Sequence, residues 1–161
     1  MPPSSEQWIE EYKGWVQPRV PEPVISVGFL HPAGAVSNIG VGRLSPALGF
    51  FRARKSNQNT GGLAKITVGS TQQACLVLTA DRLYAFAYAS GTRGKTGTVG
   101  EQLEAWPRSD VRITTKAGRL TTRVELDIAT TGKHYELECM TTAGNAGTSQ
   151  LFLRELTSGS V

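Results

Sequence analysis

Apolar and polar residues alternate along the second half of the chain, from residue 63 onward. The clearest alternation lies in residues 119–130, where aliphatic side chains fall on one face and threonine, arginine and acidic side chains on the other. A period of two is typical of a strand that buries one face and exposes the other. The pattern predicts seven strands, at residues 63–69, 74–79, 82–89, 100–106, 110–116, 119–130 and 133–141.

Short turns and a final helix complete this predicted sheet. Glycine-bearing turns at Ala117-Gly118 and Thr131-Gly132 predict that neighbouring strands are antiparallel. Residues 148–156 return to a helical spacing, with Phe152 and Leu156 four positions apart. An amphipathic helix can cover the open end of a bent sheet. The expected fold is therefore mainly β, a barrel or sandwich of seven antiparallel strands with a C-terminal helix, plus an N-terminal helix.

The N-terminal helix is expected within residues 1–23, and Pro18, Pro21 and Pro23 are expected to end it. Ser4 or Ser5 can cap it, and five apolar side chains then share one face of a 3.6-residue repeat. These apolar residues are Trp8, Ile9, Tyr12, Trp15 and Val16. We expect this face to dock on the domain, with a partner-binding or membrane-surface helix as the alternative.

Residues 24–62 carry little secondary-structure signal and recurrent glycine. Their most apolar stretch, residues 24–51, is interrupted by histidine, proline, asparagine and arginine, whereas a spanning helix needs about 20 predominantly apolar residues. We expect three parts: the helix in residues 1–23, a glycine-rich irregular segment in residues 24–62, and a compact domain in residues 63–157.

The segment ACLVLTADRLYAFAY, residues 74–88, contains a threonine, an acid and a base between two apolar runs. It could be a catalytic or nucleotide-binding loop, or a turn inside a hairpin. Both runs have the length of a short strand, so we interpret residues 79–82 as a turn between two strands, with Asp81 and Arg82 as turn formers.

Two short segments, LTADRLYAF at residues 78–86 and WPRSDV at residues 106–111, occur in the same order as the predicted elements. Together with that order, they resemble the bacterial pleckstrin-homology-like (PH-like) domains, whose relatives include the GRAM domains, and in particular a type found in small actinobacterial proteins. The resemblance covers residues 63–157. It implies a non-enzymatic module that binds lipid headgroups, peptides or its own kind, with no catalytic residues to carry over.

The net charge of +4 is unevenly distributed. Residues 31–99 hold eight lysine or arginine residues and one acid, Asp81, whereas both flanking parts carry a net negative charge. Such asymmetry can mark a surface for an anionic partner. The candidate anion or lipid contacts are Arg52, Arg54, Lys55, Arg93 and Lys95.

Catalytic and phosphate-binding motifs are not recognised. Gly94-Lys95-Thr96 would need a glycine at position 89 and a following helix to form a P-loop, but Ala89 stands there and a predicted strand follows. His31 is expected beside Pro32 in a loop and His134 on a strand facing solvent, so neither marks a nucleophile–base pair. We therefore expect no enzyme activity.

The two cysteines, Cys75 and Cys139, lie in apolar runs without a CxxC spacing. Buried free thiols are the favoured interpretation, and a single disulfide is the alternative. No cofactor and no metal site are expected.

These patterns favour a non-catalytic PH-like interaction module that binds a protein partner or self-associates. The alternative is a peripheral membrane module that binds anionic lipid through the basic middle of the chain. Nucleic acid is not an expected partner, because the net charge is small and the aromatic residues of 82–89 belong to the predicted core. The N-terminus lacks the pattern of a secretory signal, so we expect a cytoplasmic protein that could reach the membrane surface as a peripheral protein.

Overall fold

The structure, a computed structural model, describes residues 3–32, 65–67, 70–89, 97–119, 121–140 and 146–158. Its helices are α1 (Ser5–Val16) and α4 (Ala146–Ser158), with single 3-10 turns at η1 (Gln17–Arg19) and η2 (Arg108–Asp110). Its strands are β1 (Val24–Pro32), β2 (Lys65–Thr67), β3 (Ser70–Thr79), β4 (Arg82–Ala89), β5 (Thr98–Pro107), β6 (Val111–Ala117), β7 (Thr121–Ile128) and β8 (His134–Met140).

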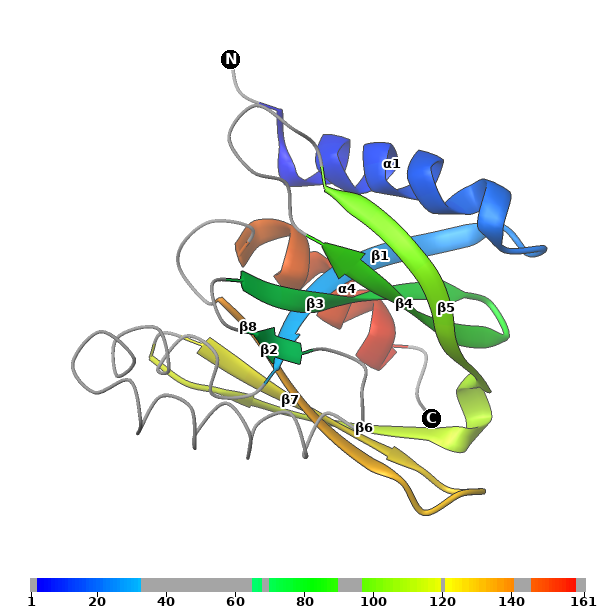
Figure 1. Ribbon diagram of the computed structural model, residues 1–161, viewed down its shortest axis with the longest axis vertical. Coiled ribbons are helices and arrows are strands. Elements are labelled where there is room, and N and C mark those ends of the chain that lie inside the picture. The colour runs from blue at the N-terminus through cyan, green and yellow to red at the C-terminus, as the bar shows by residue number, and fades with distance from the viewer. Residues whose placement is uncertain are drawn as a thin grey trace.

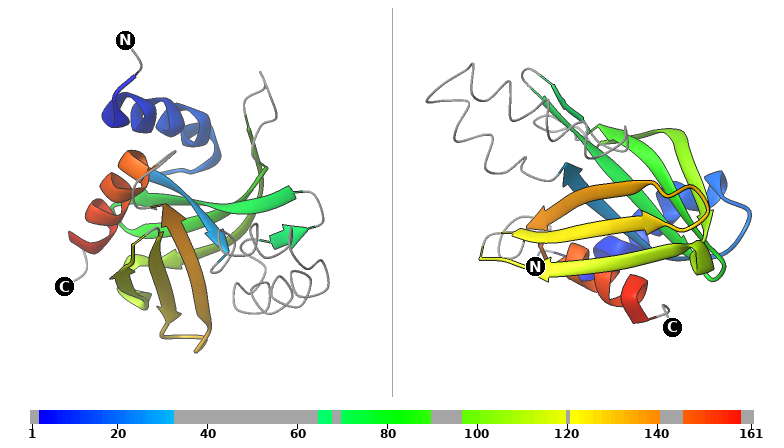
Figure 2. Two further views of the ribbon diagram at one scale, coloured as in Figure 1. Left: turned by 90° about the vertical axis from the view of Figure 1, so that its left-hand side faces the viewer. Right: turned by 90° about the horizontal axis from the view of Figure 1, so that it is seen from below.

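The strands form one bent antiparallel sheet in the order β5-β4-β3-β1-β8-β7-β6, with β2 added beside β3 (Figure 1). The centre of the sheet is β1, which pairs with β3 along most of its length and with β8 through His31 and Pro32 at its end. The β3–β4–β5 and β6–β7–β8 parts therefore run in different directions (Figure 2). Within the described residues no ladder joins β5 to β6, so the sheet is open rather than closed into the expected barrel.

The strand β1 differs from the sequence prediction, which assigned residues 24–62 to an irregular segment. Its residues from Ser26 to Leu30 are buried on both faces of the sheet, whereas Ile25 is exposed, so apolar and polar residues do not alternate along the strand. Of the strand expected at residues 63–69, the structure describes Lys65–Thr67, which form β2. The main path has seven strands because β1 belongs to it, whereas β2 lies off this path and pairs with β3.

Two apolar clusters lie on opposite faces of the β1–β3–β4 part. Leu76 and Leu78 of β3 belong to the inner cluster, which the β6–β7–β8 part and α4 complete. Cys75 and Val77 of the same strand belong to the outer cluster, which α1 covers. Both faces of β3 are therefore dry, which explains its continuous apolar sequence.

Helix α1 docks on the sheet as expected. Ser4 begins it with a capping box, in which its hydroxyl accepts from the N–H of Gln7 and the Gln7 side chain accepts from the Ser4 N–H. Ile9, Tyr12 and Val16 are buried against the domain, so most of the apolar face packs within the chain, whereas Trp8 at its start is exposed.

The remaining local predictions concern the turn at residues 79–82 and the two thiols. The Thr79 hydroxyl accepts from the N–H of Arg82 at 3.1 Å, which confirms the turn between β3 and β4. Cys75 and Cys139 are buried and free, which excludes the disulfide alternative. None of the helices in the described part of the chain is long and apolar enough to cross a membrane.

Candidate functional site

The basic residues predicted to contact an anion lie outside the described residues. They are Arg52, Arg54, Lys55, Arg93 and Lys95. The anion site therefore stays a prediction, and the candidate site is built from the described strands.

The outer face of β6, β7 and β8 gathers charged and polar side chains, because each strand turns its alternate residues toward the core. On β7 and β8, Val124, Leu126, Tyr135 and Leu137 point inward and are buried. We call the opposite surface the polar face. Its members are Arg112, Thr114 and Lys116 of β6, Arg123, Glu125 and Asp127 of β7, and His134 and Glu136 of β8. Glu138 follows on the same side of β8 but is buried, opposite His31 of β1.

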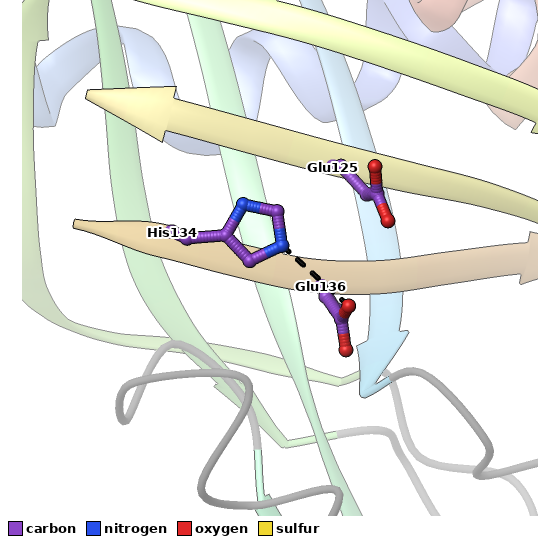
Figure 3. Close-up of side chains that lie close together, drawn as sticks. All are labelled: Glu125, His134 and Glu136. Atoms are coloured by element: carbon purple, nitrogen blue, oxygen red, sulfur yellow. Dashed lines mark ion pairs between the residues drawn. The ribbon is translucent and has the colours of Figure 1, made fainter. Parts of the chain in front are cut away.

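The register of β7 and β8 brings three carboxylates around one imidazole. Glu125 lies directly opposite Glu136, and Asp127 directly opposite His134. His134 Nδ1 is 2.6 Å from Asp127 Oδ1. Its Nε2 is 3.5 Å from Glu136 Oε1, the ion pair drawn in Figure 3. The hydrogen bond to Asp127 is the main cause that raises the pKa of His134, and Glu136 adds to the effect.

Glu125, His134 and Glu136 could hold a metal ion, since each offers a ligand atom and these atoms lie within 4.8 Å of one another. His134 is exposed, as its place on the predicted strand indicated, but its grouping with Glu125 and Glu136 was not predicted. The sequence does contain a signal for this grouping. Glu125 and Glu136 are the same number of residues from the centre of the β7–β8 hairpin, and so are Asp127 and His134.

His31 differs from its prediction as a surface histidine in a loop. It lies in β1, opposite Glu138, and its ring is only partly exposed. Burial lowers the pKa of His31, and the nearby Glu138 carboxylate opposes this effect.

The two free edges of the sheet differ in how much backbone they offer. On β5, Arg19 donates to the carbonyl oxygens of Val99 and Gly100, at 3.4 and 2.7 Å. Part of the backbone of this edge therefore already has a hydrogen-bond partner. Within the described part of the chain, β6 pairs only with β7.

One hydrogen bond just before β6 shows which of its residues bond to β7. The N–H of Ala129 donates to the carbonyl oxygen of Asp110, so Asp110 faces the partner strand. In an antiparallel ladder every second residue bonds to the partner strand, so the backbone groups of Ile113 and Thr115 point away from β7. The residues Thr114–Ala117 are all exposed, so no described element covers this edge.

The buried thiols are poor nucleophiles. Burial is the main cause that raises the pKa of Cys75 to about 12 and that of Cys139 to about 11. Both remain protonated at neutral pH, and the thiolate is the reactive form.

In comparisons with known proteins, no protein-family model matches the chain, and no curated protein matches it either. A function for the chain is therefore inferred from its own residues.

Proposed function

We propose that the chain is a non-catalytic PH-like module that binds an extended segment of a protein partner at the free edge of β6. The order β5-β4-β3-β1-β8-β7-β6 supports the PH-like resemblance. Two antiparallel meanders meet at β1, and the C-terminal helix covers the inside of the bend (Figure 2).

The interior of the bend favours a surface interaction over an enclosed ligand. Large side chains from the sheet and from α4 fill it, among them Phe152, Leu156, Tyr135 and Trp106. A partner that contacts the described part of the domain therefore meets its edges or its polar face.

The observation that carries the proposal is the exposed edge of β6, which within the described residues pairs with β7 alone. An extended peptide can add to such an edge through main-chain hydrogen bonds and gain specificity from side chains. Lys116 on this edge discourages indiscriminate pairing of sheets, because a charged residue on an edge strand opposes aggregation.

The proposal can be tested with a photo-crosslinking amino acid at position 114, in the full chain and in the cells that make it. Thr115→Pro is the matched variant, because it removes an outward N–H and leaves the bonds to β7 intact. We expect one crosslinked protein species, a strong loss of it with Thr115→Pro, and renewed binding when that species is purified and mixed with the chain.

A crosslinker at Arg154 of α4, which is exposed and distant from β6 along the chain, is the control. Equal crosslinking from both positions, or no effect of Thr115→Pro in a folded variant, would contradict strand addition at β6. A crosslink to a second copy of the chain would identify the partner as the chain itself.

The peripheral membrane module is the second proposal, and the charge distribution favours it: eight basic residues and one acid occur in residues 31–99. Each basic residue near an anionic surface contributes about 1 kcal/mol. Sedimentation with anionic vesicles at low salt should then remove the protein from solution, and the pair Arg54→Glu and Lys55→Glu should weaken this binding. Equal behaviour with neutral and anionic vesicles would contradict it.

A further inference from the structure

The two glutamates at the centre of the polar face are an unfavourable pair by themselves. Glu125 and Glu136 lie directly opposite each other on β7 and β8, and like charges in this arrangement destabilise a sheet. Arg123 lies 3.9 Å from Glu136 and is exposed. None of the ion pairs found in the described residues includes Glu125. A cation between the two carboxylates would remove the repulsion.

The imidazole of His134 is already oriented to supply a ligand atom. When Nδ1 donates its hydrogen to Asp127, the lone pair of Nε2 points toward the Glu136 carboxylate (Figure 3). Two acceptors then face each other, and only a proton or a metal ion between them makes the contact favourable. Metal-binding histidines commonly donate their second nitrogen to a carboxylate in this way.

The separations suit one small ion. Ligand atoms about 2.0–2.1 Å from a tetrahedral zinc ion lie about 3.3 Å apart. His134 Nε2 and Glu136 Oε1 are 3.5 Å apart, close to that separation. The Glu125 carboxylate is within 4.8 Å of the other ligand atoms, and rotation of its side chain can close the remaining gap.

We infer that Glu125, His134 and Glu136 bind one divalent transition-metal ion on the polar face, with zinc as the ion that suits them best. Imidazole together with carboxylates favours zinc over magnesium or calcium, which prefer all-oxygen sites. Asp127 is the positioning residue, because it holds the ring of His134 and does not itself complete the ligand set. This site is independent of strand addition at β6.

The test is a titration of the full chain with zinc alone, followed by NMR of the histidine side-chain nitrogens. The chain has only two histidines, so His31 serves as an internal reference. We expect the Nε2 signal of His134 to shift and saturate at one zinc per chain, while the signals of His31 stay in place.

Substitutions on the same face separate the roles of the residues. Glu125→Gln and Glu136→Gln should each weaken zinc binding by tenfold or more, and Asp127→Asn should weaken it by about 10- to 100-fold. Glu101→Gln, an exposed glutamate on β5, is the matched control and should bind zinc like the unmodified chain. The amide spectrum of each variant shows whether it is folded.

Two results would overturn the inference. One is a His134 spectrum unchanged by a tenfold excess of zinc. The other is unchanged zinc affinity in folded Glu125→Gln and Glu136→Gln variants, because zinc would then be bound elsewhere.

Discussion

The ring of Phe152 on α4 occupies the space that a side chain at Gly28 of β1 would need. A Cβ atom at position 28 would overlap three carbon atoms of this ring. The contact lies at the centre of the sheet, where β1 is paired with β3. The absence of a side chain at Gly28 therefore sets how closely α4 approaches the sheet.

Gly28→Ala should destabilise the domain. The added methyl group forces the Phe152 ring or the backbone of β1 to move, and overpacking of this kind costs about 1–3 kcal/mol. Chemical denaturation followed by tryptophan fluorescence measures the change in the free energy of unfolding.

Gly14→Ala is the control for this substitution. Gly14 lies in α1, where an added methyl group would meet no neighbouring side chain within 4 Å, so alanine should stabilise the helix by up to about 1 kcal/mol.

In a Phe152→Ala background, Gly28→Ala should cost little. A full cost in that background would show that the ring is not the obstacle.

Strands with one polar face were predictable from their alternation, and β4, which buries both faces, was predictable because the turn at residues 79–82 limits its apolar run. The bounds of β4 agree with the prediction, and β7 and β8 lie within theirs, because polar and apolar residues alternate or a turn limits the run. In β1 both faces are covered, by α1 and by α4, so Val27 and Gly28 give no alternation to detect.

The polar face was predictable only in part. Alternation correctly placed Asp127 and His134 on an exposed face, but their contact depends on the register of two strands. A shift of one residue at the hairpin would have moved every side chain to the opposite face. A single sequence does not fix that register as firmly as it fixes the strands themselves.

Arg19→Lys should destabilise the attachment of the N-terminal segment almost as much as Arg19→Ala. The planar guanidinium donates to two carbonyl oxygens on β5 and also lies 5.1 Å from the centroid of the Phe86 ring. Lysine keeps the charge but cannot reproduce this fork. We expect a loss of about 1 kcal/mol in unfolding free energy, reduced by the exposure of Arg19.

Arg154→Ala on α4 is the comparison for Arg19, because it removes another exposed arginine. Its unfolding free energy should change little. If Arg19→Lys behaves like the unmodified protein, the charge rather than the two hydrogen bonds holds the segment.

Tyr84 should make the stability sensitive to alkaline pH. Burial, and then the hydrogen bond that its hydroxyl donates to Glu22 at 2.6 Å, raise the pKa of Tyr84 from 10.0 to about 12. The unfolded chain therefore loses this proton first, so stability present below pH 10 is lost as the pH rises toward 12.

Tyr84→Phe should flatten part of this alkaline decline and cost about 1 kcal/mol at neutral pH through the lost hydrogen bond. Denaturation curves of both proteins across this pH range provide the measurement. An identical decline in the two proteins would assign the effect to other groups, such as the buried Cys75.

His134 and His31 should titrate on opposite sides of the ordinary histidine pKa when metal is removed by a chelator. The hydrogen bond to Asp127 raises the pKa of His134 above 6.5, whereas burial lowers that of His31. The stability contributed by protonated His134 is full below pH 6.5 and is lost as the pH rises through its folded pKa. An NMR titration measures both values, and Asp127→Asn should lower only that of His134.

Arg123 competes with a metal ion for Glu136. Its Nη1 lies 3.9 Å from Glu136 Oε1, and its positive charge also opposes the approach of a cation. Exposed ion pairs contribute about 0.2–1 kcal/mol, so Arg123→Gln should strengthen zinc binding by about two- to fivefold. Calorimetric titration with zinc measures the change, and Arg112→Gln, on the neighbouring strand of the same face, tests whether any lost positive charge has the same effect. If Arg123→Gln weakens zinc binding instead, Arg123 holds Glu136 in the geometry that binds the metal rather than competing with it.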